Sequence, residues 1–268
     1  MLLKMVIKMK KIKYLFIALA FTSCGVIAAE RIVEDSLVYD DPTVSKAGQW
    51  KGGVSFDLYR FTSPVSATNT QGQSVSATEN LTQPGVSGFA GYGDFTLLGS
   101  YRQGQSTTQY GSPVSNSGQT TSYETEFDLR YLATPLAMEY FVPYVMLSYI
   151  NHRESDYVSG SYVNGVGEHN FLTLKGPGAG IGGIIPITAK YGLRVDERFF
   201  DANNTNQSNI YPSLGFSAHA NVNITTATAY YNVTDNINAQ VGFRSQQVHQ
   251  TNNNSTTNGY YATIGYTF

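Results

Sequence analysis

The sequence "GYYATIGYTF", residues 259–268, closes the chain with a two-residue period. Every second position carries an apolar or aromatic side chain, and the positions between them carry Tyr261 or small and hydroxylated residues. This period indicates a β-strand, because successive side chains of a strand point to opposite faces. The strand has one apolar face, which packs either inside a soluble β-sandwich or against lipid. The apolar set is Tyr260, Ala262, Ile264, Tyr266 and Phe268.

The N-terminal residues have the composition of a secretory signal. Five lysines precede a short apolar stretch, and small residues follow it. We expect a signal peptide over residues 1–29, with translation starting at Met1 or Met9. A lipoprotein-type signal around Cys24 is the alternative. Because Cys24 is the only cysteine, removal of the signal peptide leaves no thiol for a disulfide or a metal site.

The composition after the signal narrows the class of protein. From Glu30 onward the chain holds 12 Lys and Arg against 19 Asp and Glu, a net charge of −7. This acidic balance argues against a nucleic-acid partner. Charged residues make up only 13% of the chain, whereas an ordinary soluble domain is about a quarter charged. No apolar run of about 20 residues follows the signal. A secreted β-sandwich and an outer-membrane β-barrel both fit these properties.

Segments of alternating polarity recur through residues 49–268, and the connections between them are alternately short and long. Short connections carry Gly, Pro, Asp or Asn, and long ones are rich in Ser, Thr, Asn and Gln. Transmembrane barrels sort their connections this way, with tight periplasmic turns and long outer loops. We therefore predict an all-β fold, a single antiparallel up-and-down transmembrane β-barrel in the cell outer membrane, preceded by a periplasmic lead at 30–48. Ten strands are expected, with eight or twelve as alternatives, at 50–61, 83–92, 95–104, 122–133, 139–151, 169–185, 190–201, 214–231, 236–249 and 258–268.

Three of the expected strands carry charges on a single face. In "SYETEFDLRYL" (122–132), four charged residues alternate with apolar or hydroxylated ones. A charge facing hydrocarbon costs about 2–4 kcal/mol at mid-depth, so these side chains are expected in the lumen. "YGLRVDERFF" (191–200) shows the same sorting except at Glu197, which falls on the apolar face and is expected near a rim, and "NINAQVGFRSQ" (236–246) shows it throughout. The network is either a structural filling of a narrow lumen or a lining that sets ion preference. Its predicted members are Glu124, Glu126, Asp128, Arg130, Arg194, Asp196, Arg198 and Arg244.

The chain resembles a known family at its end and in its repeating units. Ile264, Tyr266 and Phe268 resemble the terminal signal by which the barrel assembly machinery of Gram-negative bacteria recognises its substrates. "VPYVMLSY", "GPGAGIGGIIPITAKYGLRVDERF" and "YYNVTDNINAQVGFR" are similar to the strand–turn–strand units of the small OmpA-like, porin-family outer-membrane β-barrels. The resemblance covers most of residues 50–268 and implies a barrel surrounded by outer-membrane lipid and lipopolysaccharide. That superfamily includes anchors, adhesins, narrow pores and a few enzymes.

The residues give little sign of catalysis. Ser217 and His219 share a strand face, as a nucleophile and its base would, but we expect them to be polar filling of the lumen. His152, His169 and His249 are expected in or beside outer loops, without metal-ligand spacing. We predict no enzyme, no cofactor and no metal, and favour a structural barrel or a narrow small-solute channel with a charge-filled lumen. An adhesin or receptor whose loops bind an unidentified ligand, and a hydrolase at the barrel rim, are the alternatives.

Overall fold

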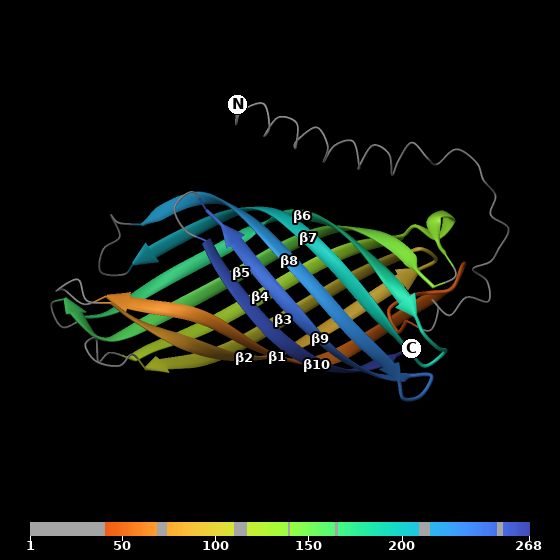
Figure 1. The fold of residues 1–268 in the computed structure, drawn as a ribbon, viewed down its shortest axis with the longest axis horizontal. Coiled ribbons are helices and arrows are strands. Elements are labelled where there is room, and N and C mark those ends of the chain that lie inside the picture. The colour runs from red at the N-terminus through yellow and green to blue at the C-terminus, as the bar shows by residue number, and fades with distance from the viewer. Residues whose placement is uncertain are drawn as a thin grey trace, which may run out of the picture. The chain divides into compact units, whose positions relative to one another are not determined.

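The ten strands close into one barrel (Figure 1). A computed structural model describes residues 41–68, 74–109, 117–138, 140–163, 166–208, 215–250 and 254–268. The expected signal peptide at 1–29 and residues 30–40 of the expected lead lie outside this part of the chain. Among the residues described, no helix is long and apolar enough to cross a bilayer. The strands are β1 (Trp50–Thr68), β2 (Ser74–Tyr92), β3 (Phe95–Gln109), β4 (Ser117–Leu132), β5 (Val142–Val163), β6 (Val166–Pro186), β7 (Tyr191–Ser208), β8 (Phe216–Asn232), β9 (Ile237–His249) and β10 (Asn254–Thr267).

Every strand pairs antiparallel with its neighbours in the chain, and the ring closes where the first strand meets the last. Gly53 to Thr62 of β1 pair with Thr267 to Asn258 of β10. A short 3-10 turn, Thr134–Leu136, lies in the connection between β4 and β5. The predicted antiparallel up-and-down barrel of ten strands is confirmed. Closure leaves no strand edge unpaired, which a lipid environment requires.

The outward face carries a belt of exposed apolar side chains, such as Leu147 on β5 (65% exposed) and Ile181 on β6 (63%). On each strand we count ten residues outward from the first lipid-facing position at the inner end. The side chain that faces outward at that point is polar in every strand. At about 3.3 Å per residue and a tilt of about 40°, ten residues rise about 25 Å, the height of the apolar band in outer-membrane barrels. The barrel therefore spans the outer membrane, as predicted. The polar residues that mark the outer edge are Arg60, Thr82, Gln105, Thr121, Arg153, Lys175, Asp201, Asn221, Gln247 and Asn258.

The strands continue beyond this outer edge further than the alternation predicts. β1 is expected to end at 61 and ends at Thr68, and β5 is expected to end at 151 and ends at Val163. Much of the sequence expected as long loops is therefore paired strand. Above the lipid both faces of the wall are free to be polar, so the period that marks a strand in the sequence disappears.

Two apolar clusters lie inside the barrel, and the outer one reaches the level of the charged residues, since Ile150 pairs with Glu126 and Ile224 with Arg198. The inner cluster is near the short turns, and the outer cluster lines the walls of β5 to β8. In the outer half of β8, from Ala218 to Thr225, the usual order is reversed, because apolar side chains point inward and polar ones outward. The inner cluster comprises Val44, Leu132, Val142, Tyr144, Met146, Ile184 and Tyr230. The outer cluster comprises Ile150, Leu174, Phe200, Ala202, Ala220, Val222 and Ile224.

Candidate functional site

Acidic side chains of β4 face the lumen and meet arginines from two other strands. Glu124 forms an ion pair with Arg102 of β3. Arg244 of β9 reaches the same carboxylate, with Nη2 3.1 Å from Oε1 of Glu124, and it lies 2.5 Å from Oε1 of Glu126. The four side chains are nearly completely buried. Because β4 and β9 stand five strands apart in the ring of ten, this contact joins opposite walls of the barrel.

Arg198 of β7 links the network to a third wall. Its Nη1 lies 3.2 Å from Oε2 of Glu126 and 3.2 Å from Oδ2 of Asp128, and its Nε lies 3.2 Å from Oδ1 of Asp196. A neighbouring glycine gives this arginine its space, since a Cβ at Gly180 would lie 2.6 Å from Cγ of Arg198. Six of the eight predicted lumen charges thus form one connected group.

Three members of this group, Arg102, His152 and Glu154, were not among the predicted residues. His152 is expected beside an outer loop, but it lies within β5, with Nδ1 3.1 Å from Oε2 of Glu124 and Nε2 2.8 Å from Oε1 of Glu154. Arg102 places its guanidinium 4.2 Å from the ring centroid of Tyr59, and that ring stacks on Tyr261 at 4.7 Å. The parity of β3 is the signal that could have found Arg102, because Phe95, Leu97 and Tyr101 alternate on the opposite face.

Asp41–Ser45 turns into the barrel at its inner end. The backbone N–H of Val44 donates to the carbonyl of Asp41 at 3.1 Å, which makes a β-turn with Pro42 at its second position. The N–H and hydroxyl of Thr43 donate to Oδ1 of Asp41 at 2.8 and 2.6 Å. Asp41 and Val44 are 0% and 1% exposed. The sequence predicts this segment as part of a periplasmic lead, whereas the structure buries it in the mouth.

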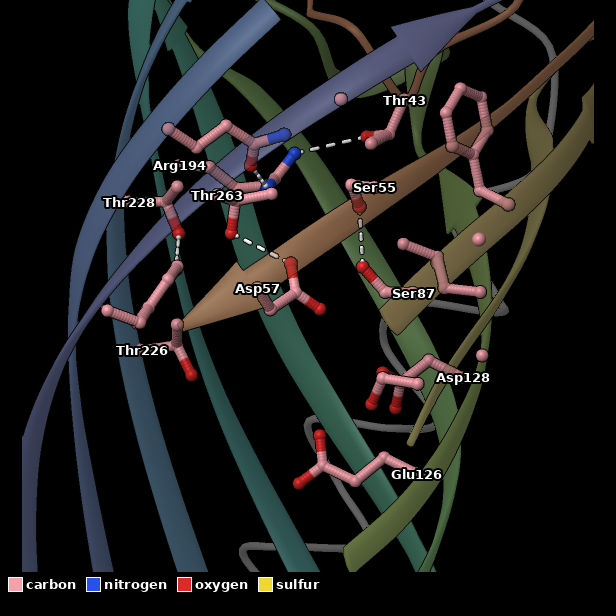
Figure 2. Close-up of a pocket in the computed structure, with 18 of the residues that line it drawn as sticks. Thr43, Ser55, Asp57, Ser87, Glu126, Asp128, Arg194, Thr226, Thr228 and Thr263 are labelled. Atoms are coloured by element: carbon pink, nitrogen blue, oxygen red, sulfur yellow. Dashed lines mark hydrogen bonds between the residues drawn. The ribbon is translucent and has the colours of Figure 1, made fainter. Parts of the chain in front are cut away.

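The remaining two predicted charges hold this turn. Nη1 of Arg194 lies 3.1 Å from Oδ2 of Asp41 and donates to the hydroxyl of Thr43 at 3.1 Å (Figure 2). Nη2 of Arg130 donates to the carbonyl and the hydroxyl of Thr43 at 2.8 and 2.7 Å. Burial raises the pKa of the Asp41 carboxyl, but Arg194, Arg130 and the hydrogen bonds from Thr43 outweigh burial and hold that pKa below its usual value. Arg130 and Arg194 therefore belong to the inner mouth and not to the cross-lumen group.

A chamber of about 160 Å³ separates the turn from the cross-lumen network. Hydroxyl and carboxylate groups line much of it: Thr263 donates to Oδ1 of Asp57 at 2.9 Å, and the hydroxyls of Ser55 and Ser87 lie 2.6 Å apart (Figure 2). Such a cavity has room and partners for a few water molecules. The lumen thus holds a polar chamber between the Asp41–Ser45 turn at its inner mouth and an ion-paired constriction.

Ser217 and His219 lie outside the lumen, contrary to expectation. Both side chains are exposed on the outward face of β8, and Nδ1 of His219 lies 3.1 Å from Oδ1 of Asp201. The inward positions beside His219 carry Ala218 and Ala220, and Ala220 belongs to the outer cluster. His249 is also exposed on an outward face, and the side chain of His169 lies outside the described part of the chain.

The predicted assembly signal lies on the lipid-facing side of β10. Ile264, Tyr266 and Phe268 are 60%, 52% and 70% exposed. The backbone of Phe268 exchanges hydrogen bonds with Gly52 at 2.8 and 3.0 Å, which ties the end of the chain to β1. Recognition of these residues by the assembly machinery stays a prediction.

The apolar belt, the polar lumen and the closed sheet define the class of this protein as an outer-membrane β-barrel. No protein-family model and no curated protein sequence matches the chain. Among solved structures it is similar to the outer membrane protease OmpT from Escherichia coli, with 15% identity and a TM-score of 0.46 over 84% of this chain and 99% of that one. The translocator domain of the autotransporter NalP from Neisseria meningitidis has 14% identity and a TM-score of 0.44, over 82% and 88% of the two chains. The outer membrane protein OprG from Pseudomonas aeruginosa has 11% identity and a TM-score of 0.36, over 85% and 99%.

These values are too low to carry any of the neighbours' activities to this chain. Membership of the OmpA-like or porin family, predicted from the sequence, stays a prediction.

Proposed function

We propose that this protein is a narrow small-solute channel of the outer membrane, whose water path is restricted by ion pairs across its lumen. The observation that carries the proposal is the contact of Glu126 with Arg244, which joins opposite walls at the level of a polar chamber. Charged and hydroxylated groups inside a barrel favour water and small polar solutes.

The size of the path follows from the number of strands and from what fills them. Barrels of about eight strands have interiors that side chains fill, and ten strands add little room. The arginines and carboxylates of the network occupy this room, and the apolar outer cluster narrows the lumen above them. Solutes larger than a few water molecules in cross-section would have to displace these side chains.

Liposome swelling tests this function. Vesicles that contain the purified barrel should swell in small solutes such as glycine or glycerol and should not swell in a disaccharide. Vesicles with Glu126→Gln should swell faster in the small solutes, because one anchor of the constriction is lost. Equal swelling in the disaccharide and in glycine would contradict a narrow channel, and no swelling in either variant would favour a purely structural barrel.

A second function, surface recognition, is favoured by one observation. β5 and β6 continue as a paired hairpin for about ten residues beyond Arg153 and Lys175, which lie at the outer edge of the lipid belt. This part of the wall projects from the membrane, and Glu154 at its base contacts the lumen network through His152, so the hairpin is to be shortened beyond Glu154. Shortening this hairpin should abolish binding to cells or phage without changing liposome swelling if the barrel is a receptor or adhesin.

A further inference from the structure

Within the described part of the chain, no carboxylate of the barrel wall lies within ion-pair distance of Arg130 or Arg194. Among the described residues, the carboxylate within ion-pair distance of Arg194 is that of Asp41, and Arg130 contacts the turn through Thr43. The other lumen arginines pair with Glu124, Glu126, Asp128 or Asp196 of the wall. If the turn left the mouth, both guanidinium groups would lose the charge of Asp41, and the wall carboxylate near them, Asp196, already pairs with Arg198. A buried arginine in that position recruits an anion, and its planar donors match a carboxylate.

The turn also places an apolar side chain, that of Val44, in the inner mouth. The i to i+3 hydrogen bond places Val44 beside Asp41, and the buried side chain of Val44 belongs to the inner apolar cluster. Gln240 completes the polar side, because its Oε1 accepts from Nη2 of Arg194 at 2.9 Å. The mouth therefore holds a carboxylate on one side and a short branched alkyl group on the other.

We propose that Arg130, Arg194 and the inner apolar cluster form a binding site for small carboxylates with a short branched apolar chain, and that Asp41 and Val44 occupy this site in cis. The proposal rests on the channel function, because it places the site on the solute path. The turn acts as a tethered competitor, which keeps the mouth closed until a carboxylate solute replaces it.

Competition with a tethered group sets the expected affinity. A short tether holds its group at an effective concentration on the order of mM, so a free carboxylate acts on the wild type only at high concentration. Asp41→Asn removes the tethered charge and keeps the size of the side chain. This variant should respond to isovalerate at a concentration at least about ten-fold lower than the wild type.

The test measures the thermal unfolding midpoint of the purified full-length barrel, with isovalerate as the probe. Isovalerate should raise the midpoint of Asp41→Asn, and Asp41→Asn combined with Arg194→Gln should lose this response. The matched control is Asp57→Asn, which removes an equally buried carboxylate that Thr263 holds and no arginine contacts in the described structure. This control should behave as the wild type does. The uncharged analogue 3-methylbutan-1-ol should have no effect on any variant.

A disulfide lock tests the same site by a second route. An added Cβ at Gly91 lies 3.1 Å from Oγ of Ser45, so the side chains of cysteines at these two positions would be in contact. Ser45→Cys with Gly91→Cys, placed in the Asp41→Asn variant, should block the response to isovalerate when oxidised. Reduction should restore the response.

The two proposals fail in different ways. An equal response of Asp41→Asn, Asp57→Asn and the Arg194→Gln double variant, or no response from any of them, would overturn the carboxylate site. The unfolding midpoint does not depend on conduction. A selective response of Asp41→Asn without liposome swelling in any variant would therefore overturn the channel and leave the site standing.

Discussion

Glu126 on β4 and Arg244 on β9 meet at 2.5 Å across the lumen, although their strands are five apart in either direction around the ring. An ion pair between opposite walls holds these walls together and narrows the water path between them. Its energy depends on burial: exposed ion pairs contribute about 0–1 kcal/mol, whereas breaking a buried one costs about 3–5 kcal/mol. The two side chains are 7% and 2% exposed, so the second range applies.

Arg244→Gln should lower the free energy of unfolding by about 3 kcal/mol, because Glu124 and Glu126 lose a counter-charge in a buried setting. The measurement is the urea midpoint of folded protein in lipid vesicles. Arg60→Gln is the control, since that arginine is exposed on the outward face and its loss should cost about 0.5 kcal/mol or less. Equal losses for the two variants would mean that the network does not brace the barrel.

Much of this architecture could be predicted, because lipid sorts side chains by strand parity. The alternation in Tyr260–Phe268 and in Glu124–Arg130 located strands and assigned their faces. The same rule failed above the lipid belt, where the wall meets water on the outside. On β8 the change begins just inside the edge marked by Asn221: Val222 and Ile224 point inward and His219 outward, which is the order of a soluble barrel, and the pair Ser217 and His219 was assigned to the wrong face.

Strand parity also explains why only part of the lumen network could be predicted. Parity assigns a charge to the inside but does not choose its partner, so the sequence did not separate Arg194 and Arg130 from the cross-lumen group. Asp41 carried a turn signal in "DPTV" (41–44), since Asp and Pro favour the first two positions of a β-turn. Burial of this turn depends on contacts with residues about 90 and 150 positions later, such as Arg130 and Arg194, and no local pattern reports such contacts.

A side chain at Gly180 should destabilise the barrel, because Arg198 occupies the space beside this glycine. Gly180→Val places a Cβ 2.6 Å from Cγ of Arg198 and 2.9 Å from the carbonyl oxygen of Glu197, so Arg198 must leave its position between the carboxylates. We expect a loss of about 1–3 kcal/mol in unfolding free energy. Gly99→Val is the matched control, because its Cβ would lie 3.4 Å from the ring of Phe127 on the lipid-facing side. Equal stability of both variants would contradict the assigned close approach.

The terminal aromatic residue should be needed for assembly and not for the folded state. Phe268→Ala keeps the backbone hydrogen bonds to Gly52 and removes only the ring, so unassembled protein should accumulate in the periplasm. Tyr260→Ala is the control, because Tyr260 is 71% exposed on the same face of β10, against 70% for Phe268. The fraction of heat-modifiable protein on gels measures assembly. A similar yield for the two variants would count against the terminal signal.

The position of the lipid belt predicts how charge is tolerated with depth. Leu147→Arg puts a cation on the outward face near mid-height and should cost about 2–4 kcal/mol, whereas Thr121→Arg at the outer edge should cost about 0–1 kcal/mol. Unfolding in vesicles measures both values. Equal costs would show that Leu147 does not lie deeper in the lipid belt than Thr121 does.

Single-channel recording in planar bilayers tests the central claim that ion pairs across the lumen restrict the path. The wild type should give small or intermittent currents, and Arg244→Gln and Glu126→Gln should each increase the conductance and lengthen the open events. Arg60→Gln, which is outside the lumen, should leave the currents unchanged. A wild type that forms a large, steady and unselective pore, indifferent to Arg244→Gln and Glu126→Gln, would contradict the account.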